Sequence, residues 1–314
     1  MTAIKVNVDN FARAETDRMF AGIQGNAGGV NRFEHNRVPA PIDQQTVIRM
    51  NRDTLYSFAI VNIATGASIT IPDAGERYLS VMVVNEDHYI NRVFHDPGTY
   101  EISVDEFGTP FVAIVARTLV DPRDLDDLAA VAAIQDQLTV TATSDEPFQS
   151  PEYDTVSLDR TRSALLSLAT DMASFERSFG PRDLVDPVHH LVSTAAGWGG
   201  LPDAEATYVG VSPGLPVGDY TLTVGDDVPV DGFWSISVYN ADGFFEPNDA
   251  GAYSVNSITA VRNSDRTVTV RFGGSGDAAQ NSLPITEGWN YLVRLYRPRP
   301  EISSGAWTFP AITG

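Results

Sequence analysis

Hydrophobic and polar residues alternate along two long parts of the chain. This two-residue period is typical of strands with one buried face. The turn sequences ATG, PDAG and HDPG separate the strands of the first part, and most connections are short, which favours antiparallel pairing. The predicted strands are 54–63, 67–71, 78–84, 99–103 and 110–116 in the first part, and 219–224, 232–240, 252–262, 267–272 and 289–297 in the second.

Helical spacing of apolar residues appears before and between these two parts. Residues 9–25 predict a short amphipathic helix that ends at Gly25. Three further helices are predicted between the strand regions. Their apolar positions are Leu125, Leu128, Val131 and Leu138 in the first, Leu165, Leu168, Met172, Phe175 and Phe179 in the second, and Leu184, Val188, Leu191 and Ala195 in the third.

The order of strands, helices and strands predicts a mainly β protein with a helical bridge. We expect two antiparallel β-sandwich (jelly-roll-like) domains joined by about three helices. The expected ranges are 1–30 for a helical lead-in, 31–140 for the first sandwich with its closing helix, 141–200 for a linker and helical bridge, and 201–314 for the second sandwich.

Two stretches at corresponding places in the β regions share a framework. YLSVMVVNEDHYINRVFHDPGTY (78–100) and FWSISVYNADGFFEPNDAGAY (233–253) each carry a serine, then Asn-x-Asp at the strand end, then Gly-x-Tyr. The matched pairs are Ser80 and Ser235, Asn85 and Asn240, Asp87 and Asp242, and Tyr100 and Tyr253. A duplicated sandwich explains this match, and an Asx residue at a strand end is good turn chemistry.

The composition narrows the classes of partner. The formal charge is −20, and like charge repels both nucleic acid and anionic membrane surfaces. The chain has no cysteine, which excludes disulfides, thiolate metal sites and a cysteine nucleophile. Neither a signal peptide nor a membrane-spanning segment is apparent in the sequence, so we expect a cytoplasmic protein. A small-molecule substrate is the expected partner, and the sequence leaves open whether the chain forms a homo-oligomer.

The stretch IRMNRDTLYSFAIVNI (48–63) concentrates charged groups where a strand begins. Arg49, Asn51, Arg52 and Asp53 precede the strand, and Tyr56 lies on it. An arginine beside a carboxylate can be a structural clamp, or it can anchor an anion or carbonyl next to an acid or base. With two arginines present, we expect at least one of these groups to face a cavity.

The two matched stretches differ in ionisable content. The first carries His88, Tyr89, Arg92 and His95, where the second has Gly, Phe and acidic or amide residues. Histidine is the usual side chain for proton transfer near neutral pH, so these residues are candidates for catalysis. A structural role in loop contacts is the alternative. No cofactor is expected, but His88 and His95 are also candidate ligands of a divalent metal ion.

The aromatic stretches VDGFWSISVYN and EGWNYLVRLYRPRP indicate core strands with one polar face. Trp234 is the candidate for ligand recognition if such a face acts as a carbohydrate platform.

At these motifs the sequence resembles a bacterial family built from two domains of unknown function, numbered 1254 (N-terminal) and 1214 (C-terminal). The resemblance covers roughly residues 10–310. It implies two β-sandwich domains bridged by helices and implies no settled activity. The matching stretches are RMNRDTLYS, RYLSVMVVNEDHYINRVFHDPGTY, LVDPRDLDDLAAVAAIQDQL, TAAGWGGLPDAEATYV, DVPVDGFWSISVYNADGFFEPND and LPITEGWNYLVRLYRPRPEI.

The leading functional hypothesis is a hydrolase-like enzyme that uses acid–base chemistry on a small organic molecule in the N-terminal domain. Arg49 and Arg52 would anchor a carboxylate or polarise a carbonyl. Asp53 or His88 would be the general base, and Tyr56 or Tyr89 a proton donor. Asn51, Arg92, His95 and Trp234 are candidate substrate contacts. The alternatives are a non-catalytic module that binds carbohydrate or another ligand or assembles with partners, and a metal-dependent enzyme using His88 and His95.

Overall fold

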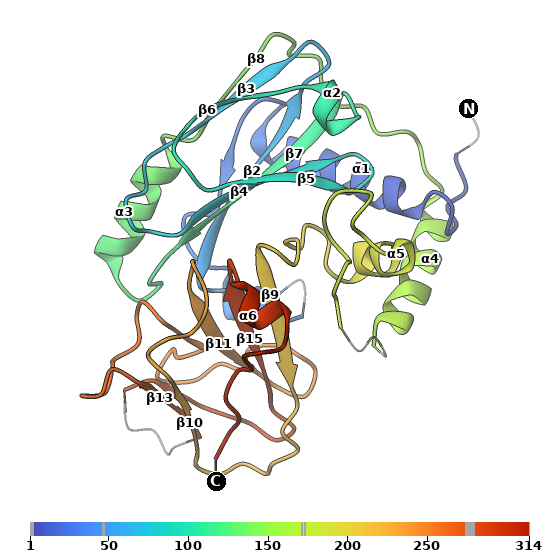
Figure 1. The fold of residues 1–314 in the computed structure, drawn as a ribbon. Coiled ribbons are helices and arrows are strands. Elements are labelled where there is room, and N and C mark those ends of the chain that lie inside the picture. The colour runs from blue at the N-terminus through green and yellow to red at the C-terminus, as the bar shows by residue number, and fades with distance from the viewer. Residues whose placement is uncertain (1–2, 46–47, 171, 173, 274–279, 314) are drawn as a thin grey trace. The chain divides into compact units, whose positions relative to one another are not determined.

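The computed structural model describes residues 3–45, 48–170, 172, 174–273 and 280–313 (Figure 1). The chain divides into two compact units that interleave along the sequence. The first unit contains Met1–Arg37, Leu55–Leu119 and Asp126–Asp203, and the second contains Val38–Thr54, Val120–Leu125 and Ala204–Gly314. Within the described residues, no helix is both long enough and apolar enough to span a bilayer.

The first unit contains two sheets that pack face to face. The larger sheet has the order β1 (Glu34–His35), β2 (Thr54–Asn62), β7 (Phe111–Leu119), β4 (Leu79–Asn85), β5 (Ile90–Phe94). The smaller has the order β6 (Gly98–Ile102), β3 (Ala67–Ile71), β8 (Thr139–Ala142). Alternate residues from both sheets, including Val61, Ile69, Val83 and Ile114, form one buried apolar cluster. This is the core of a β-sandwich.

Helices complete the first unit. They are α1 (Phe11–Ala27), the short α2 (Val104–Phe107), α3 (Leu125–Gln135), α4 (Thr155–Ala169) and α5 (Pro187–Ala196). An apolar cluster that includes Phe11, Leu158 and Val192 holds α1, α4 and α5 together. Asp154 and Asp186 cap α4 and α5, because each side chain accepts hydrogen bonds from backbone N–H groups of the first turn.

The second unit is also a sandwich. One sheet has the order β12 (Ser254–Asn256), β11 (Trp234–Tyr239), β15 (Asn290–Tyr296), β9 (Ala206–Val211), and the other β10 (Tyr220–Val224), β13 (Val268–Phe272), β14 (Ser282–Leu283). Its core includes Leu222, Ile236, Val270 and Val293. The short helices η1 (Ile42–Gln44) and α6 (Pro300–Ser303) also belong to this unit.

The two units share a strand order. The sequence β2-β7-β4-β5 in the first corresponds to β9-β15-β11-β12 in the second, and the antiparallel pair β3 and β6 corresponds to β10 and β13. The turns after β4 and β11 repeat the same hydrogen bonds. In one, Asn85 Oδ1 accepts from the N–H groups of Asp87 (3.0 Å) and Tyr89 (2.8 Å). In the other, Asn240 Oδ1 accepts from Asp242 (3.1 Å) and Phe244 (2.9 Å).

The mainly β, two-sandwich fold class predicted from the sequence is confirmed, and three of its details need correction. The second helix was predicted from apolar residues 165–179, but α4 ends at Ala169, and Asp171 and Ala173 within that range lie outside the described residues. The prediction missed β5 and β9, because charged residues and glycine interrupt their alternation. The Gly-x-Tyr matches are not equivalent, since Tyr100 lies in β6 and Tyr253 precedes β12. The glycine-rich stretch FGGSGDAAQ (272–280) has the composition of a hairpin loop, but its residues 274–279 lie outside the described residues.

Candidate functional site

A polar row crosses the larger sheet of the second unit on the face opposite its core. Strand register places Ser235 beside both Asn256 and Arg294, and Arg294 beside Tyr208. Directly paired residues point to the same side of a sheet, so these four side chains share one face. Ser235 Oγ is buried and has no hydrogen-bond partner among the described residues. The polar face predicted from VDGFWSISVYN therefore exists.

The segment that precedes β2 lies against this face. Arg294 donates through Nη2 to the carbonyl oxygens of Arg49 (2.8 Å) and Met50 (3.2 Å). Arg49 N–H donates to Gly243 O (2.8 Å), and Asn51 Nδ2 donates to Tyr296 Oη (3.0 Å). Arg49 and Asn51 thus act as structural contacts that fix the segment, and the Arg49 guanidinium lies near Gly210.

Asp53 is the buried carboxylate at the end of this segment. Its side chain has 0% relative exposure. Oδ1 accepts hydrogen bonds from Ser254 Oγ (2.9 Å) and Asn256 Nδ2 (3.3 Å), both on β12. Oδ2 is buried without a hydrogen-bond partner within the part of the chain that the structure describes. A buried carboxylate with one unsatisfied oxygen is costly and is a common feature of functional sites.

Arg294 provides the compensating charge for Asp53. Burial by itself lowers the pKa of Arg294, but Tyr239, Tyr296 and Asp53 oppose this effect and hold the pKa above its ordinary value. The guanidinium is therefore permanently charged, and its attraction to Asp53 reduces the cost of keeping both groups out of water.

Ser254 and Asn256 also line a hollow of about 340 Å³, including the space open to solvent. Arg52 stands at its wall: Nη1 donates to Ala40 O (2.7 Å), and the guanidinium carbon lies 5.1 Å from the centre of the Tyr253 ring. Burial lowers the pKa of Arg52, while Tyr253 and Asp53 oppose that effect. The other lining residues are Asp121, Pro122, Arg123, Gly251, Ala252 and Thr259.

His88 belongs to the first unit, and both of its ring nitrogens are engaged. Gly199 N–H donates to Nε2 (2.9 Å), so Nε2 carries the lone pair. Nδ1 then carries the proton and donates to Thr194 Oγ1 (2.9 Å), whose own hydroxyl donates to His190 O (2.7 Å). Burial, with a smaller effect from His190, lowers the pKa of His88 well below its usual value. This geometry leaves His88 no lone pair for general-base catalysis.

The remaining candidates of the first unit make local contacts. Tyr89 stacks on His190 with ring centres 4.6 Å apart. Arg92 forms an ion pair with Glu106 (3.3 Å), and His95 Nδ1 lies 3.1 Å from Leu79 O. The Tyr56 ring lies under the Arg117 guanidinium at 5.2 Å.

The predicted site residues do not all belong to one unit. Asp53 and Arg52 lie in the second unit and His88 in the first, so neither unit by itself contains the full predicted set. Trp234 is 4% exposed within the core of the second unit and is not available as a ligand platform. Among the described residues, no group of three or more His, Cys, Asp or Glu side chains is arranged to hold a metal ion.

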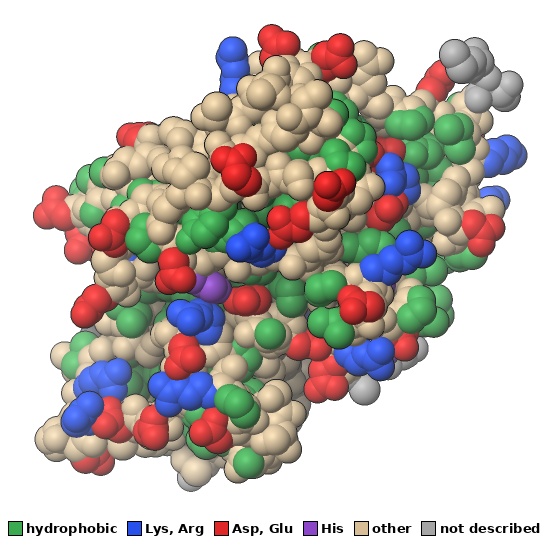
Figure 2. All heavy atoms as spheres, turned by 45° about the horizontal axis from the view of Figure 1, so that its top comes forward, with side chains coloured by type: hydrophobic (Ala, Val, Ile, Leu, Met, Phe, Trp, Pro, Cys, Tyr) green, Lys and Arg blue, Asp and Glu red, His purple; other side chains and the backbone are tan. Residues whose placement is uncertain are grey.

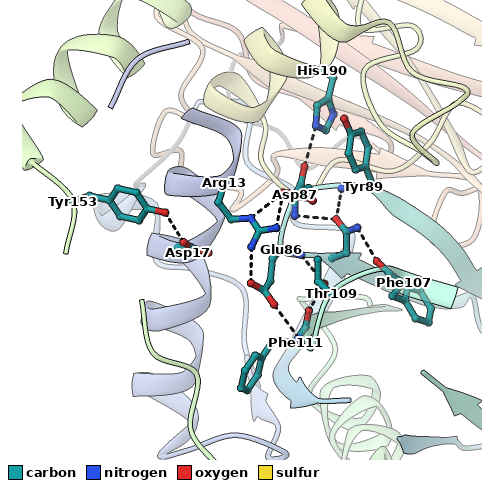
Figure 3. Close-up of polar contacts among 11 residues, drawn as sticks. Arg13, Asp17, Glu86, Asp87, Tyr89, Phe107, Thr109, Phe111, Tyr153 and His190 are labelled. Carbon is teal, nitrogen blue, oxygen red and sulfur yellow. Dashed lines mark hydrogen bonds and ion pairs between the residues drawn. The ribbon is translucent and has the colours of Figure 1, made fainter. Parts of the chain in front are cut away.

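The sequence analysis missed a partly buried ionic network in the first unit (Figure 3). Arg13 on α1 donates to Glu86 Oε2 (2.8 Å) and, through Nε, to Asp87 Oδ1 (2.8 Å). Tyr153 Oη donates to Asp17 Oδ2 (2.7 Å), and Asp17 Oδ1 is buried without a partner among the described residues. Burial raises the pKa of both Asp17 and Glu86. No spacing in the sequence connects residues so far apart along the chain.

Two sandwich units with one strand order define a duplicated β-sandwich protein, and sequence comparison identifies both halves. Residues 30–100 match the family described as "Protein of unknown function (DUF1254)", and residues 216–300 match "Protein of unknown function (DUF1214)". The chain therefore belongs to the two-domain family that combines these regions, as its motifs implied. Comparison with curated proteins gives no match.

Two of the solved structures that are similar to this chain come from Vibrio parahaemolyticus and Burkholderia cenocepacia. The VPA0106 protein from Vibrio parahaemolyticus is 17% identical with a TM-score of 0.70, over 98% of this chain and 99% of that one. A putative uncharacterized protein from Burkholderia cenocepacia is 15% identical with a TM-score of 0.52, over 98% of this chain and 87% of that one. At this identity the likeness supports the fold alone.

Proposed function

We propose that the chain is a hydrolase-like enzyme that acts on a small organic molecule in the hollow of the second unit. The observation that carries the proposal is the hydrogen bond from Ser254 Oγ to Asp53 Oδ1 at the hollow's wall (2.9 Å). Ser254 is half-buried and faces the hollow, whereas Asp53 is fully buried behind it. A nucleophile in contact with a base that is itself held in place is the common arrangement for covalent catalysis.

In the proposed reaction, Ser254 Oγ attacks the carbonyl carbon of a bound ester and its proton moves to Asp53. The resulting oxyanion accepts hydrogen bonds from the Nη groups of Arg123 at the wall, whose Nε faces Asp121. The tetrahedral intermediate then expels the alcohol, which takes the proton from Asp53. Water hydrolyses the acyl–serine in a second cycle of the same steps, and the products are a carboxylic acid and an alcohol.

Asn256 is the positioning residue in this scheme. Its Oδ1 accepts from the N–H groups of Ile258 (3.1 Å) and Thr259 (2.9 Å) and from Thr259 Oγ1 (3.0 Å). Because the amide oxygen is fixed in this way, Nδ2 must point to Asp53. Asp53 is thereby held in one orientation toward Ser254.

The proposal is tested with a fluorophosphonate probe, which reacts with activated serines, and with a panel of p-nitrophenyl esters. We expect the probe to label Ser254, and we expect Ser254→Ala to abolish both labelling and ester turnover. Asp53→Asn should lower turnover by about 100-fold or more, because general-base catalysis contributes factors of this size. Asp249→Asn, a change at an exposed carboxylate of the same unit, is the matched control and should keep full activity.

Circular dichroism and urea unfolding establish that each variant is folded before its activity is compared. Turnover and labelling that persist in folded Ser254→Ala would overturn the mechanism. Ligand binding without labelling or turnover in the parent protein would instead favour the non-catalytic ligand-binding alternative.

A further inference from the structure

The charged residues that line the hollow indicate the charge that its ligand carries. Arg123 is already compensated, since its Nε lies 3.5 Å from Asp121 Oδ1. Arg52 forms no ion pair with any described residue, and its one hydrogen bond goes to a main-chain carbonyl. The hollow therefore has one uncompensated positive charge in a chain whose formal charge is −20.

This positive charge is local. On the face drawn in Figure 2, acidic and basic side chains are interspersed and do not gather into a broad basic surface. A guanidinium that is partly removed from water, without a counter-ion, is poorly solvated and gains most from an anion that restores its hydrogen bonds. The contact of Arg52 with Tyr253 also limits the movement of its guanidinium group.

We propose that Arg52 binds the carboxylate group of a monoanionic ligand. This inference rests on the proposed function, because it assigns the substrate class of the same hollow. A single carboxylate matches the single uncompensated charge, and its two oxygens match the paired donors of a guanidinium. A doubly charged phosphate fits less well, because Asp121 lies on the same wall and Asp53 lies behind it.

The inference predicts which molecules enter the hollow. The substrate is an ester that also carries a free carboxylate, and the Ser254 hydroxyl reaches the ester carbonyl while Arg52 holds the carboxylate. A neutral ester of the same size would lose the charge-assisted contacts with Arg52, which discriminate strongly when the site is partly desolvated.

Binding is measured by isothermal titration calorimetry on the full chain that carries Ser254→Ala, so that no turnover interferes. The probes are a series of small monocarboxylates, the matching primary amides and inorganic phosphate. We expect carboxylates to bind at least about 10-fold more tightly than their amides, in line with a charge-assisted bidentate contact. Arg52→Gln should remove this preference and Arg52→Lys should weaken it, because a lysine cannot form the bidentate contact.

Arg271→Gln is the matched control, since Arg271 is an exposed arginine of the same unit, and it should leave binding unchanged. Equal affinity for carboxylates and amides, tighter binding of phosphate, or an unchanged preference in folded Arg52→Gln would each overturn the assignment. Failure of the catalytic proposal is distinguishable, because carboxylate binding to the Ser254→Ala protein does not depend on turnover.

Discussion

Replacement of His88 by glycine tests whether this histidine is a structural residue. In the second unit the equivalent turn position is Gly243, and both residues have positive φ (65° for His88 and 87° for Gly243). If His88 served only the turn, glycine would be tolerated or even preferred there, because glycine has no steric penalty at positive φ. In the structure, His88 also accepts a hydrogen bond from the Gly199 N–H.

The cost of His88→Gly can be worked out from its contacts. Loss of the Nε2 acceptor leaves one buried N–H unsatisfied, at about 1–3 kcal/mol. Removal of a fully buried ring that stacks on Trp198 leaves a cavity and costs about 2–4 kcal/mol, somewhat less than a Phe→Ala change. Glycine removes the steric strain of a non-glycine residue at positive φ, and this offsets about 1 kcal/mol of the loss in stability. The expected net loss in the free energy of unfolding of the first unit is about 2–6 kcal/mol.

Urea unfolding and amide hydrogen exchange with mass spectrometry measure this loss. Protection should fall in peptides of the first unit, with Gly199 among the first affected, while peptides of the second unit keep theirs. His88→Asn should cost less than glycine, because asparagine tolerates positive φ and its amide oxygen can accept a hydrogen bond. His189→Ala, at the half-buried neighbour of His190 on α5, is the control. A loss below about 1 kcal/mol for His88→Gly would refute the structural account.

Two further predictions concern buried titratable groups. Burial depresses the pKa of His88, so the unfolded chain binds a proton at this ring more readily than the folded chain does. The neutral ring therefore makes its full contribution to stability above about pH 6.5. Below that pH the contribution declines by up to about 1.4 kcal/mol per pH unit. Urea midpoints measured across this range should fall less steeply with acidification in His88→Asn than in the parent protein, and parallel curves would contradict the assignment. On α1, burial by itself raises the pKa of Glu15, but ion pairs with Arg18 and Arg162 outweigh it and lower the pKa, whereas burial raises the pKa of Asp17. At neutral pH, Glu15→Gln should therefore destabilise the first unit by about 1–3 kcal/mol and Asp17→Asn should be neutral or stabilising, and the reverse order in urea unfolding would show that these charges do not control stability.

The sandwich architecture could be predicted from the sequence because its signal is local. Predominantly apolar runs along 54–62, 79–85 and 290–296 indicate buried strands, and every residue of 79–85 and 290–296 is buried. The Asn-x-Asp match also reported a real repeat, since each asparagine organises its own turn with hydrogen bonds that span only two to four residues. Short edge strands such as β12 give little alternation and were predicted with the wrong length.

The chemistry of the site could be predicted only in part, because it depends on partners far away in the sequence. Asp53 was singled out, but Ser254 and Asn256 lie 201 and 203 residues further along and carry no motif of their own. His88 was one of two candidate bases, chosen as a histidine that the matched second stretch lacks. Its role depends on Gly199, 111 residues away, which occupies one nitrogen and leaves the ring without proton-transfer capacity.

The contact between Arg294 and the Arg49 carbonyl has a consequence for how the protein is made, since 245 residues separate the two. Residues 38–54 leave the ribosome long before β15 is synthesised. This segment therefore cannot pack on the polar face of the larger sheet of the second unit until translation is nearly finished. A single cut after Asp203 would also leave residues 204–314 without this covering segment. Fragments intended to isolate the second unit should therefore carry residues 38–54 as a tethered or added peptide.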